Sequence, residues 1–142
     1  MKISELMTRS VEIIEPDTTL QKAARTMHDI DAGCLPVQEN DRLVGMVTDR
    51  DIAVRGVGEG RNASAPVSDV MSREVLYCFE DQEVDEVCRN MGEIQVRRLP
   101  VLNRDKRLVG IVSLGDIAFN GEAERAGQAL SRISNPGGPH SG

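Results

Sequence analysis

The chain has 142 residues, of which 39% are hydrophobic and 28% are charged, and its formal net charge is −6. These values are typical of a globular protein large enough to bury roughly two thirds of the surface that its unfolded chain exposes. The negative charge repels phosphate backbones and anionic lipids, and the aromatic content of 2% leaves few platforms for stacking bases. The composition therefore disfavours binding to nucleic acids.

The sequence lacks the patterns typical of secretion, membrane insertion, metal binding and disulfide bonding. The N-terminal residues lack the apolar core of a signal peptide, and no apolar run approaches the roughly 18 residues of a membrane span. Three cysteines without a CxxC pair and two distant histidines predict neither a disulfide framework nor a metal site. We therefore expect a cytoplasmic protein with reduced thiols that does not interact with membranes.

The sequence contains an internal repeat, which determines how the rest of the chain is interpreted. An extra residue in the second copy falls in a polar turn over residues 103–107, where an insertion costs little. The repeated segments are Leu6-Met7-Thr8 and Val70-Met71-Ser72, Leu35-Pro36-Val37 and Leu99-Pro100-Val101, and residues 43–53 and 108–118.

Each copy predicts the same order of elements. In the first copy, an extended segment over residues 11–14 precedes a helix over residues 20–30, whose apolar residues have the i, i+3, i+4, i+7 spacing of one buried face. Strands over residues 34–38 and 43–47 follow, and a short helix runs from residue 49 to residue 56.

The second copy predicts the corresponding elements in the same order. They are an extended segment over residues 74–79, a helix from Val84 to Ile94, strands over residues 99–102 and 108–112, and a helix from residue 114 to residue 121.

Residues that satisfy free backbone groups mark the ends of these helices. We expect Thr18 and Gln21 to form a capping box at the first long helix, and Asp81 to cap its counterpart. Gly56 and Gly121 are expected to end the two short helices.

The repeat divides the chain into domains over residues 1–56 and 67–121, joined by a linker over residues 57–66. Residues 122–142 are expected to form a short helix and then a disordered tail. A copy of about 60 residues buries little core alone, so the two copies should pack together. The prediction is an α+β fold in which two β-α-β-β-α repeats form one pseudo-two-fold unit.

This pair of copies resembles the CBS-domain family over residues 3–120. The resemblance depends on the opening tripeptides, on the Leu-Pro-Val strands, and above all on residues 45–51 and 110–116. Both of these segments fit the family's ribose-binding pattern, which is glycine, two mostly apolar residues, Thr or Ser, any two residues, and Asp. Two copies in register are far more specific than one. The chain is most similar to small stand-alone bacterial proteins that consist of a tandem CBS pair.

The resemblance implies a regulatory module that binds AMP, ADP, ATP, S-adenosylmethionine or NAD(H) in clefts between the copies, and that requires no cofactor. It also implies a homodimer, since CBS pairs stack through their helices in a closed two-fold arrangement. The apolar residues expected at the dimer seam are Ile52, Val54, Ile117 and Phe119.

The candidate nucleotide-binding residues occupy equivalent positions in the two copies. Asp51 with Thr48, and Asp116 with Ser113, combine a carboxylate that can accept hydrogen bonds from both ribose hydroxyls with a hydroxyl that can contact sugar or phosphate. The resemblance also assigns the residues before each Leu-Pro to the adenine and phosphate parts of the cleft. These are Gly33 and Cys34 in the first copy, and Val96, Arg97 and Arg98 in the second.

The two arginines distinguish the copies, because Gly33 and Cys34 offer no charge at the corresponding positions. A guanidinium group is suited to phosphate, so the second copy should hold any phosphate. Neighbouring strand residues point to opposite faces, and Arg98 is the stronger candidate.

Structural roles can account for the same residues. The two Thr/Ser-x-x-Asp segments also fit helix N-caps, and the arginines also fit solvated charges on a strand. Cys34 and Cys88 fit apolar core positions better than redox centres. One residue can both cap a helix and bind a ligand. One cleft of a CBS pair can also lose ligand binding while the other cleft retains it.

Two functions remain open at this point. The first is a regulatory module whose ligand changes how it engages an unidentified protein partner. The second is a dimeric structural or interaction protein with vestigial nucleotide pockets. An enzyme is disfavoured, because the sequence has no nucleophile with an adjacent base and no His or Cys constellation.

Overall fold

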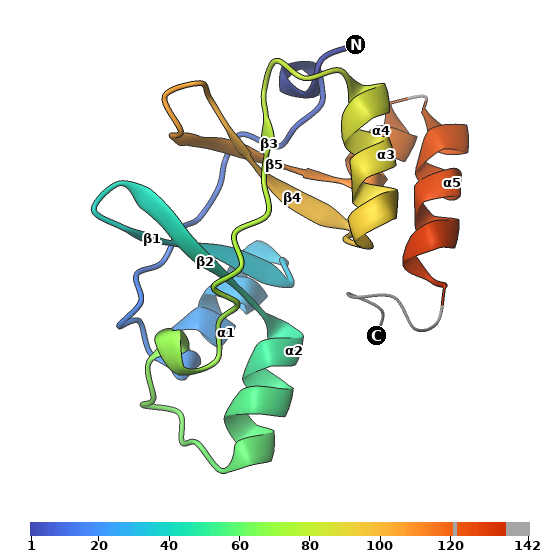
Figure 1. The fold of residues 1–142 in the computed structure, drawn as a ribbon. Helices are drawn as coiled ribbons and strands as arrows, with labels where there is room; N and C mark the ends of the chain where they lie inside the picture. The colour runs from blue at the N-terminus through green and yellow to red at the C-terminus, as the bar shows by residue number, and fades with distance from the viewer. Residues whose placement is uncertain (121, 136–142) are drawn as a thin grey trace. The chain divides into compact units, whose positions relative to one another are not determined.

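The computed structural model describes residues 1–120 and 122–135. No helix within these residues is both long enough and apolar enough to cross a membrane. In chain order the helices and strands are α1 (Leu20–Ile30), β1 (Cys34–Glu39), β2 (Arg42–Thr48), α2 (Asp49–Asp51), β3 (Cys78–Phe79), α3 (Val84–Ile94), β4 (Arg98–Leu102), β5 (Leu108–Ser113), α4 (Leu114–Phe119) and α5 (Ala123–Ile133) (Figure 1).

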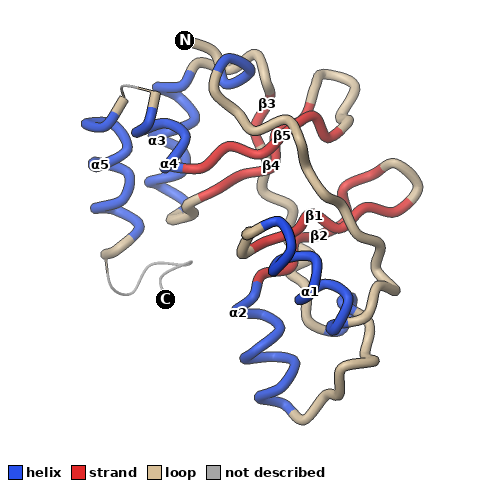
Figure 2. Tube along the Cα trace, turned by 180° about the vertical axis from the view of Figure 1, so that it is seen from behind, coloured by secondary structure: helices blue, strands red, loops and turns tan. Residues whose placement is uncertain are grey.

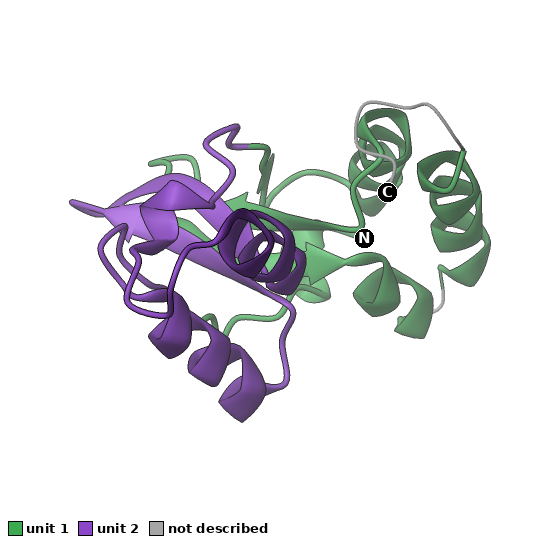
Figure 3. Ribbon diagram, turned by 90° about the horizontal axis from the view of Figure 1, so that it is seen from below, with its two compact units in different colours: residues 1–11, 76–142 green, residues 12–75 purple. Residues whose placement is uncertain are grey.

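The chain forms two compact units, each with its own core. Unit 2 consists of Glu12–Val75, and unit 1 consists of Met1–Val11 together with the described part of Leu76–Gly142 (Figure 3). The units therefore differ from the sequence repeats at their edges, because the opening segment of each copy packs with the body of the other copy. The mixture of helices and small sheets within each unit confirms the α+β class.

In unit 1, the N-terminal segment pairs with β5. Thr8 N donates to the carbonyl oxygen of Ile111 at 2.8 Å, and Ile111 N donates back to Thr8 O at 2.9 Å. Ile3, Leu6 and Met7 are buried in the core of this unit. The segment that opens the first copy thus completes the second.

Unit 2 repeats this arrangement with the segment that opens the second copy. Ser72 N donates to Met46 O at 2.8 Å, and Met46 N donates to Ser72 O at 3.0 Å. Val67, Val70 and Met71 are buried in the core of unit 2. The repeated tripeptides therefore have the same structural role in both units, which is to close a core against the second hairpin strand.

Helix α1 and a two-stranded hairpin make the rest of unit 2. The apolar face predicted for α1 is buried, with Leu20, Ala23 and Met27 in the core. Strands β1 and β2 pair antiparallel, with Cys34 opposite Thr48. This hairpin confirms the two predicted strands and is visible among the strands in Figure 2.

Unit 1 has the corresponding hairpin, formed by β4 and β5, and the short strand β3 runs parallel to β4. Its additional element is α5, which packs on α3 and α4 (Figure 1). The α5 residues Ala126, Ala129 and Ile133 join the core, and Gln95 Nε2 donates to Arg132 O at 2.8 Å. The short helix predicted after residue 122 is confirmed over Ala123–Ile133, whereas the tail from residue 136 lies outside the described residues.

The predicted dimer seam is partly wrong. Ile117 is fully buried in the core of unit 1, because α4 is covered by α5. Phe119, by contrast, is 92% exposed, and Val54 is 51% exposed. Ile52 is half-buried and packs against the core of unit 2, so Val54 and Phe119 are the most exposed of the four predicted residues.

Several local predictions are also wrong. The extended segments are shorter than predicted, since only Ile14 forms a bridge in the first copy and β3 covers only Cys78–Phe79 in the second. Thr19, and not Thr18, caps α1, because its side chain accepts from Lys22 N. Thr18 Oγ1 instead accepts from Glu15 N at 3.1 Å.

Two further helix ends differ from the prediction. Glu83, and not Asp81, occupies the N-cap position of α3, because the Asp81 carboxylate pairs with Arg104 at 2.8 Å. α2 continues as a π-helical segment, Ile52–Gly56, which ends at Gly56 as predicted. Gly56 is not a left-handed cap, however, because a 3-10 turn over Val57–Glu59 follows and the left-handed residue is Gly60, with φ of 82°. Gly121 lies outside the described residues.

Candidate functional site

The first candidate site lies where β2 passes into α2. Thr48 Oγ1 accepts a hydrogen bond from Asp51 N at 3.0 Å, and Asp51 Oδ2 accepts one from Thr48 N at 2.9 Å. These reciprocal bonds form the capping box that the spacing of the two residues predicts. Both residues are half-buried, so the carboxylate is held rigidly at the edge of unit 2.

The passage from β5 into α4 repeats this geometry in unit 1. Ser113 Oγ accepts from Asp116 N at 3.1 Å, and Asp116 Oδ2 accepts from Ser113 N at 3.0 Å. Both residues are again half-buried. We call the two sites the first junction (Thr48 to Asp51) and the second junction (Ser113 to Asp116).

The junctions differ in what contacts the second carboxylate oxygen. At the first junction, Asp51 Oδ1 accepts from Arg55 Nη2 at 3.0 Å. At the second junction, position 120 holds asparagine, and its Nδ2 donates to the backbone oxygen of Asp116. Among the described residues, Asp116 Oδ1 has no hydrogen-bond partner. Arg55 was not among the predicted site residues, although its place four residues after Asp51 on a helix predicts an ion pair.

The residues before each Leu-Pro are brought to the matching junction by the strand ladder. Asp49 N donates to Gly33 O at 3.0 Å, and Leu114 N donates to Arg97 O at the same distance. Cys34 lies opposite Thr48 in one hairpin, and Arg98 lies opposite Ser113 in the other. The structure thus places each predicted pair of segments side by side within its own unit.

These neighbouring residues differ in exposure. Cys34 is 5% exposed, and Val96 is half-buried and packs against the core of unit 1. Arg97 and Arg98 are both exposed, and within the described part of the chain neither side chain has an ion-pair or hydrogen-bond partner. The second junction therefore has two cations beside it that are not neutralised within its unit.

All three cysteines are buried, as predicted for Cys34 and Cys88. Burial raises the pKa of the Cys78 thiol to about 12. Burial also raises the pKa of Cys88, whose Sγ donates to the Arg125 carbonyl oxygen at 3.2 Å. Neither environment favours a reactive thiolate.

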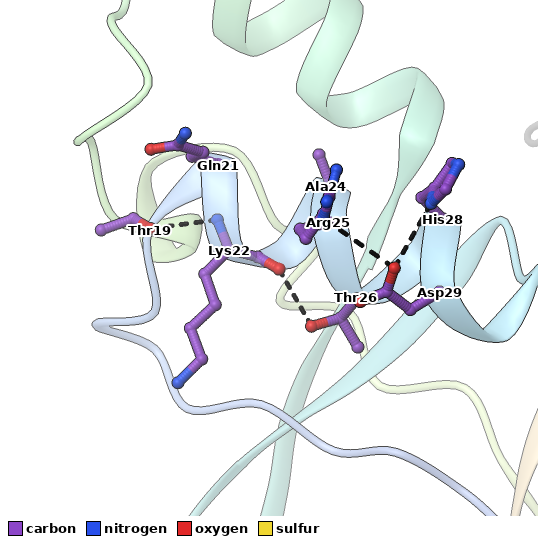
Figure 4. Close-up of a pocket in the computed structure, with 8 residues that line it drawn as sticks. All are labelled: Thr19, Gln21, Lys22, Ala24, Arg25, Thr26, His28 and Asp29. Carbon is purple, nitrogen blue, oxygen red and sulfur yellow. Dashed lines mark hydrogen bonds and ion pairs between the residues drawn. The ribbon is translucent and has the colours of Figure 1, made fainter.

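A surface depression along α1 does not contain any of the candidate residues. Figure 4 shows that its lining comes from this one helix and its N-cap, Thr19. The polar groups there satisfy one another, since Thr26 Oγ1 donates to Lys22 O at 2.9 Å and Asp29 pairs with Arg25 at 3.8 Å. We assign no function to this depression, because a single exposed helix face cannot enclose a ligand.

Within residues 1–120 and 122–135, no three His, Cys, Asp or Glu side chains are clustered so as to hold a metal ion. His28, the histidine of α1, has an exposed side chain beside Asp29 at 3.3 Å.

Comparisons with known proteins agree with the duplicated geometry. A model of the CBS domain matches residues 3–57 and 67–120. The CBS domain-containing protein YhcV of Bacillus subtilis is 41% identical over 134 residues, covering 94% of this chain and 95% of the relative.

Two solved structures are similar as well. Hypoxic Response Protein I, crystallised with two coordinated zinc ions, is 36% identical with a TM-score of 0.75, covering 84% of this chain and 98% of that one. A CBS domain pair in complex with 5′-methylthioadenosine and S-adenosyl-L-methionine is 24% identical with a TM-score of 0.76, covering 87% of this chain and 98% of that one. The chain therefore belongs to the CBS-domain family and contains two CBS domains in tandem.

Proposed function

We propose that this CBS pair is a non-catalytic, cytoplasmic regulatory module that binds an adenosine-containing ligand at its two junctions. CBS pairs are regulatory modules, and one CBS pair of the same fold is crystallised with 5′-methylthioadenosine and S-adenosylmethionine. The candidate ligands here are AMP, ADP, ATP, S-adenosylmethionine and NAD(H). Ligand binding then changes the affinity of the module for a protein partner.

The observation that carries this proposal is the state of the Asp116 carboxylate. One oxygen is fixed by Ser113 N, and the other has no partner among the described residues. A half-buried carboxylate with a free oxygen is a strong acceptor, and hydrogen bonds to a charged group contribute about 1.5 to 3 kcal/mol. The ribose 2′ and 3′ hydroxyls are a pair of donors suited to such a group.

The phosphate of a nucleotide would be held by the exposed arginines beside the second junction. Arg98 lies directly opposite Ser113 in the ladder, and Ser113 shares its capping box with Asp116 at the start of α4. Ribose and phosphate are adjacent in a nucleotide, and this spacing on the protein suits a ligand that contains both. Gly33 and Cys34 offer no such charge at the first junction.

A second function, a structural or interaction protein with vestigial pockets, is favoured by a different observation. The first junction is satisfied without any ligand, because Asp51 uses one oxygen for the capping box and the other for Arg55. If the second junction behaves in the same way, both aspartates serve only as helix caps.

Self-association is part of the proposal under either function. Phe119 and Val54 occupy equivalent positions of the two short helical segments and are both largely exposed. Covering these two side chains with a second copy of the chain would remove apolar surface from water, which favours association. We propose that the chain forms a homodimer through these helical segments.

Nucleotide binding separates the two functions. A ligand that binds only the folded state adds about 2.7 kcal/mol of stability at a hundredfold excess over its dissociation constant. We expect at least one of AMP, ADP, ATP, S-adenosylmethionine and NADH to raise the melting temperature by several degrees and to give a calorimetric binding isotherm. If none of them gives a shift or a heat signal, the structural function is correct.

A further inference from the structure

The first junction carries an ion pair that the second junction lacks. Arg55 Nη2 and Asp51 Oδ1 are 3.0 Å apart, and the Asp51 side chain is only 14% exposed. Arg55 itself is 46% exposed, so the guanidinium side of the ion pair is in contact with solvent. Asp51 therefore has both oxygens engaged within unit 2.

The second junction differs at the equivalent helix position. Asn120 cannot form an ion pair with Asp116, and its amide instead donates to the Asp116 backbone oxygen. The capping boxes of the two junctions otherwise match, with all four hydrogen bonds between 2.9 and 3.1 Å. The side chain four residues after each aspartate is therefore the local feature that gives the two carboxylates different hydrogen-bond partners.

We propose that Arg55 is a specificity-determining residue that weakens ribose binding at the first junction, so that the first ligand molecule occupies the second junction. This inference rests on the proposed function, since it concerns the same two carboxylates. A ribose diol must compete with the guanidinium for Asp51 Oδ1, whereas it meets no competitor at Asp116 Oδ1.

The size of the effect follows from the exposure of the pair. The guanidinium of this i, i+4 ion pair is exposed although the carboxylate is not, and a pair accessible to water is worth little. Displacing it reduces affinity by about two- to five-fold. The pair also weakens with added salt, because solvent-exposed charges are screened. The two junctions should therefore fill in sequence, with an affinity difference that shrinks at high ionic strength.

The test measures each junction separately in the full chain, by calorimetry with adenosine and with AMP. In the Asp116→Asn variant only the first junction keeps its carboxylate. In the Asp51→Asn variant only the second junction keeps its carboxylate. Adding Arg55→Ala to Asp116→Asn should tighten adenosine binding about two- to five-fold. Adenosine is the decisive probe because it has no phosphate that Arg55 can attract.

Two further variants control for charge and for position. Arg25→Ala removes the same charge from unit 2, but Arg25 pairs with Asp29 on α1 and not with Asp51. Adenosine affinity should therefore not change in this variant. Asn120→Arg in the Asp51→Asn background introduces the missing arginine and should weaken adenosine binding about two- to five-fold. A thermal melt of each variant confirms that it is folded.

The outcomes distinguish this inference from the proposed function. If neither probe binds the unsubstituted chain, and none of ADP, ATP, S-adenosylmethionine and NADH binds it either, both are overturned. If the probes bind but Arg55→Ala leaves adenosine affinity unchanged or weakens it, Arg55 is not a competitor and this inference alone is wrong. Weaker AMP binding with unchanged adenosine binding would instead make Arg55 a phosphate contact.

Discussion

The carbonyl oxygen of Ser72 lies 2.6 Å from the position that a β-carbon on Gly45 would occupy. Gly110 and the Thr8 carbonyl oxygen repeat this relationship in the other unit, at 2.8 Å. In both cases the crowding atom belongs to a backbone that is fixed by a β-bridge, Met46 to Ser72 or Thr8 to Ile111. Each Gly-x-x-Thr/Ser-x-x-Asp segment therefore begins with glycine because the opening segment of the other copy packs closely against that position.

Alanine at either glycine should destabilise the unit that contains it. Neither bridge can move away without breaking its hydrogen bonds, so we expect Gly45→Ala and Gly110→Ala each to cost about 1 to 3 kcal/mol. Gly127→Ala is the matched control, because nothing lies within 4 Å of its β-carbon and alanine favours a helix. Urea denaturation measures all three variants, and a Gly45→Ala chain as stable as the Gly127→Ala chain would contradict this account.

The glycines also show what sequence analysis could and could not predict. The order of elements, the buried face of α1, both hairpins and both capping boxes depend on residues close together in the chain, so local patterns were sufficient. The exchange of opening segments depends on contacts between residues far apart, such as Thr8 with Ile111. A local sequence pattern does not indicate whether an opening segment packs against its own copy or against the other copy.

Errors at helix ends had a different cause, which is competition between neighbouring polar residues. Thr18 and Thr19 are both good caps, and the choice depends on which backbone donor each one meets in the fold. Asp81 was available as a cap but is taken by Arg104, from a turn 23 residues away. The Asp51–Arg55 pair, in contrast, was predictable from spacing alone.

The buried cysteines should be unreactive in the native protein. Burial raises the pKa of Cys78 from 9.0 to about 12, so the thiol stays protonated at pH 8. We expect iodoacetamide to modify none of the three thiols in the native chain and all of them in urea, as measured by intact mass. Rapid native labelling of Cys78 or Cys88 would show that unit 1 opens easily.

The same pKa shift makes stability depend on pH in the alkaline range. A folded-state pKa above the unfolded value of 9.0 means that the unfolded chain ionises Cys78 first. The contribution of the protonated thiol is therefore complete below pH 9 and is lost as the pH rises from 9 towards 12. Cys78→Ser removes this dependence, since serine does not ionise in that range.

Arg98 should contribute to affinity only for ligands that carry phosphate. Its side chain is exposed and unpaired among the described residues, so Arg98→Ala should leave folding intact. We expect AMP affinity to fall by about ten-fold, as for a lost charge-assisted hydrogen bond, and adenosine affinity to stay the same. Isothermal titration with both ligands measures this, and an equal loss for both would remove Arg98 from the phosphate role. Arg9→Ala serves as a control, because Arg9 bonds a backbone oxygen in the opening segment.

Association of two chains should depend on the exposed aromatic residue of α4. We expect sedimentation at micromolar concentration to give twice the mass of one chain, since homodimers of two-fold symmetry are the commonest assembly. Phe119→Ser should shift this equilibrium towards the monomer, whereas Tyr77→Ser, which changes another partly exposed ring, should not. A monomer at every concentration for the unsubstituted chain would exclude the dimer.

The most direct test of the central claim replaces the two carboxylates that the junctions hold. Asparagine can cap a helix nearly as well as aspartate, so Asp116→Asn and Asp51→Asn should each cost less than about 1 kcal/mol of stability. If the junctions bind ribose, Asp116→Asn should also weaken AMP by about ten- to a hundred-fold in isothermal titration calorimetry. Unchanged AMP affinity in both variants and in the double variant would contradict the account and reduce the two junctions to helix caps.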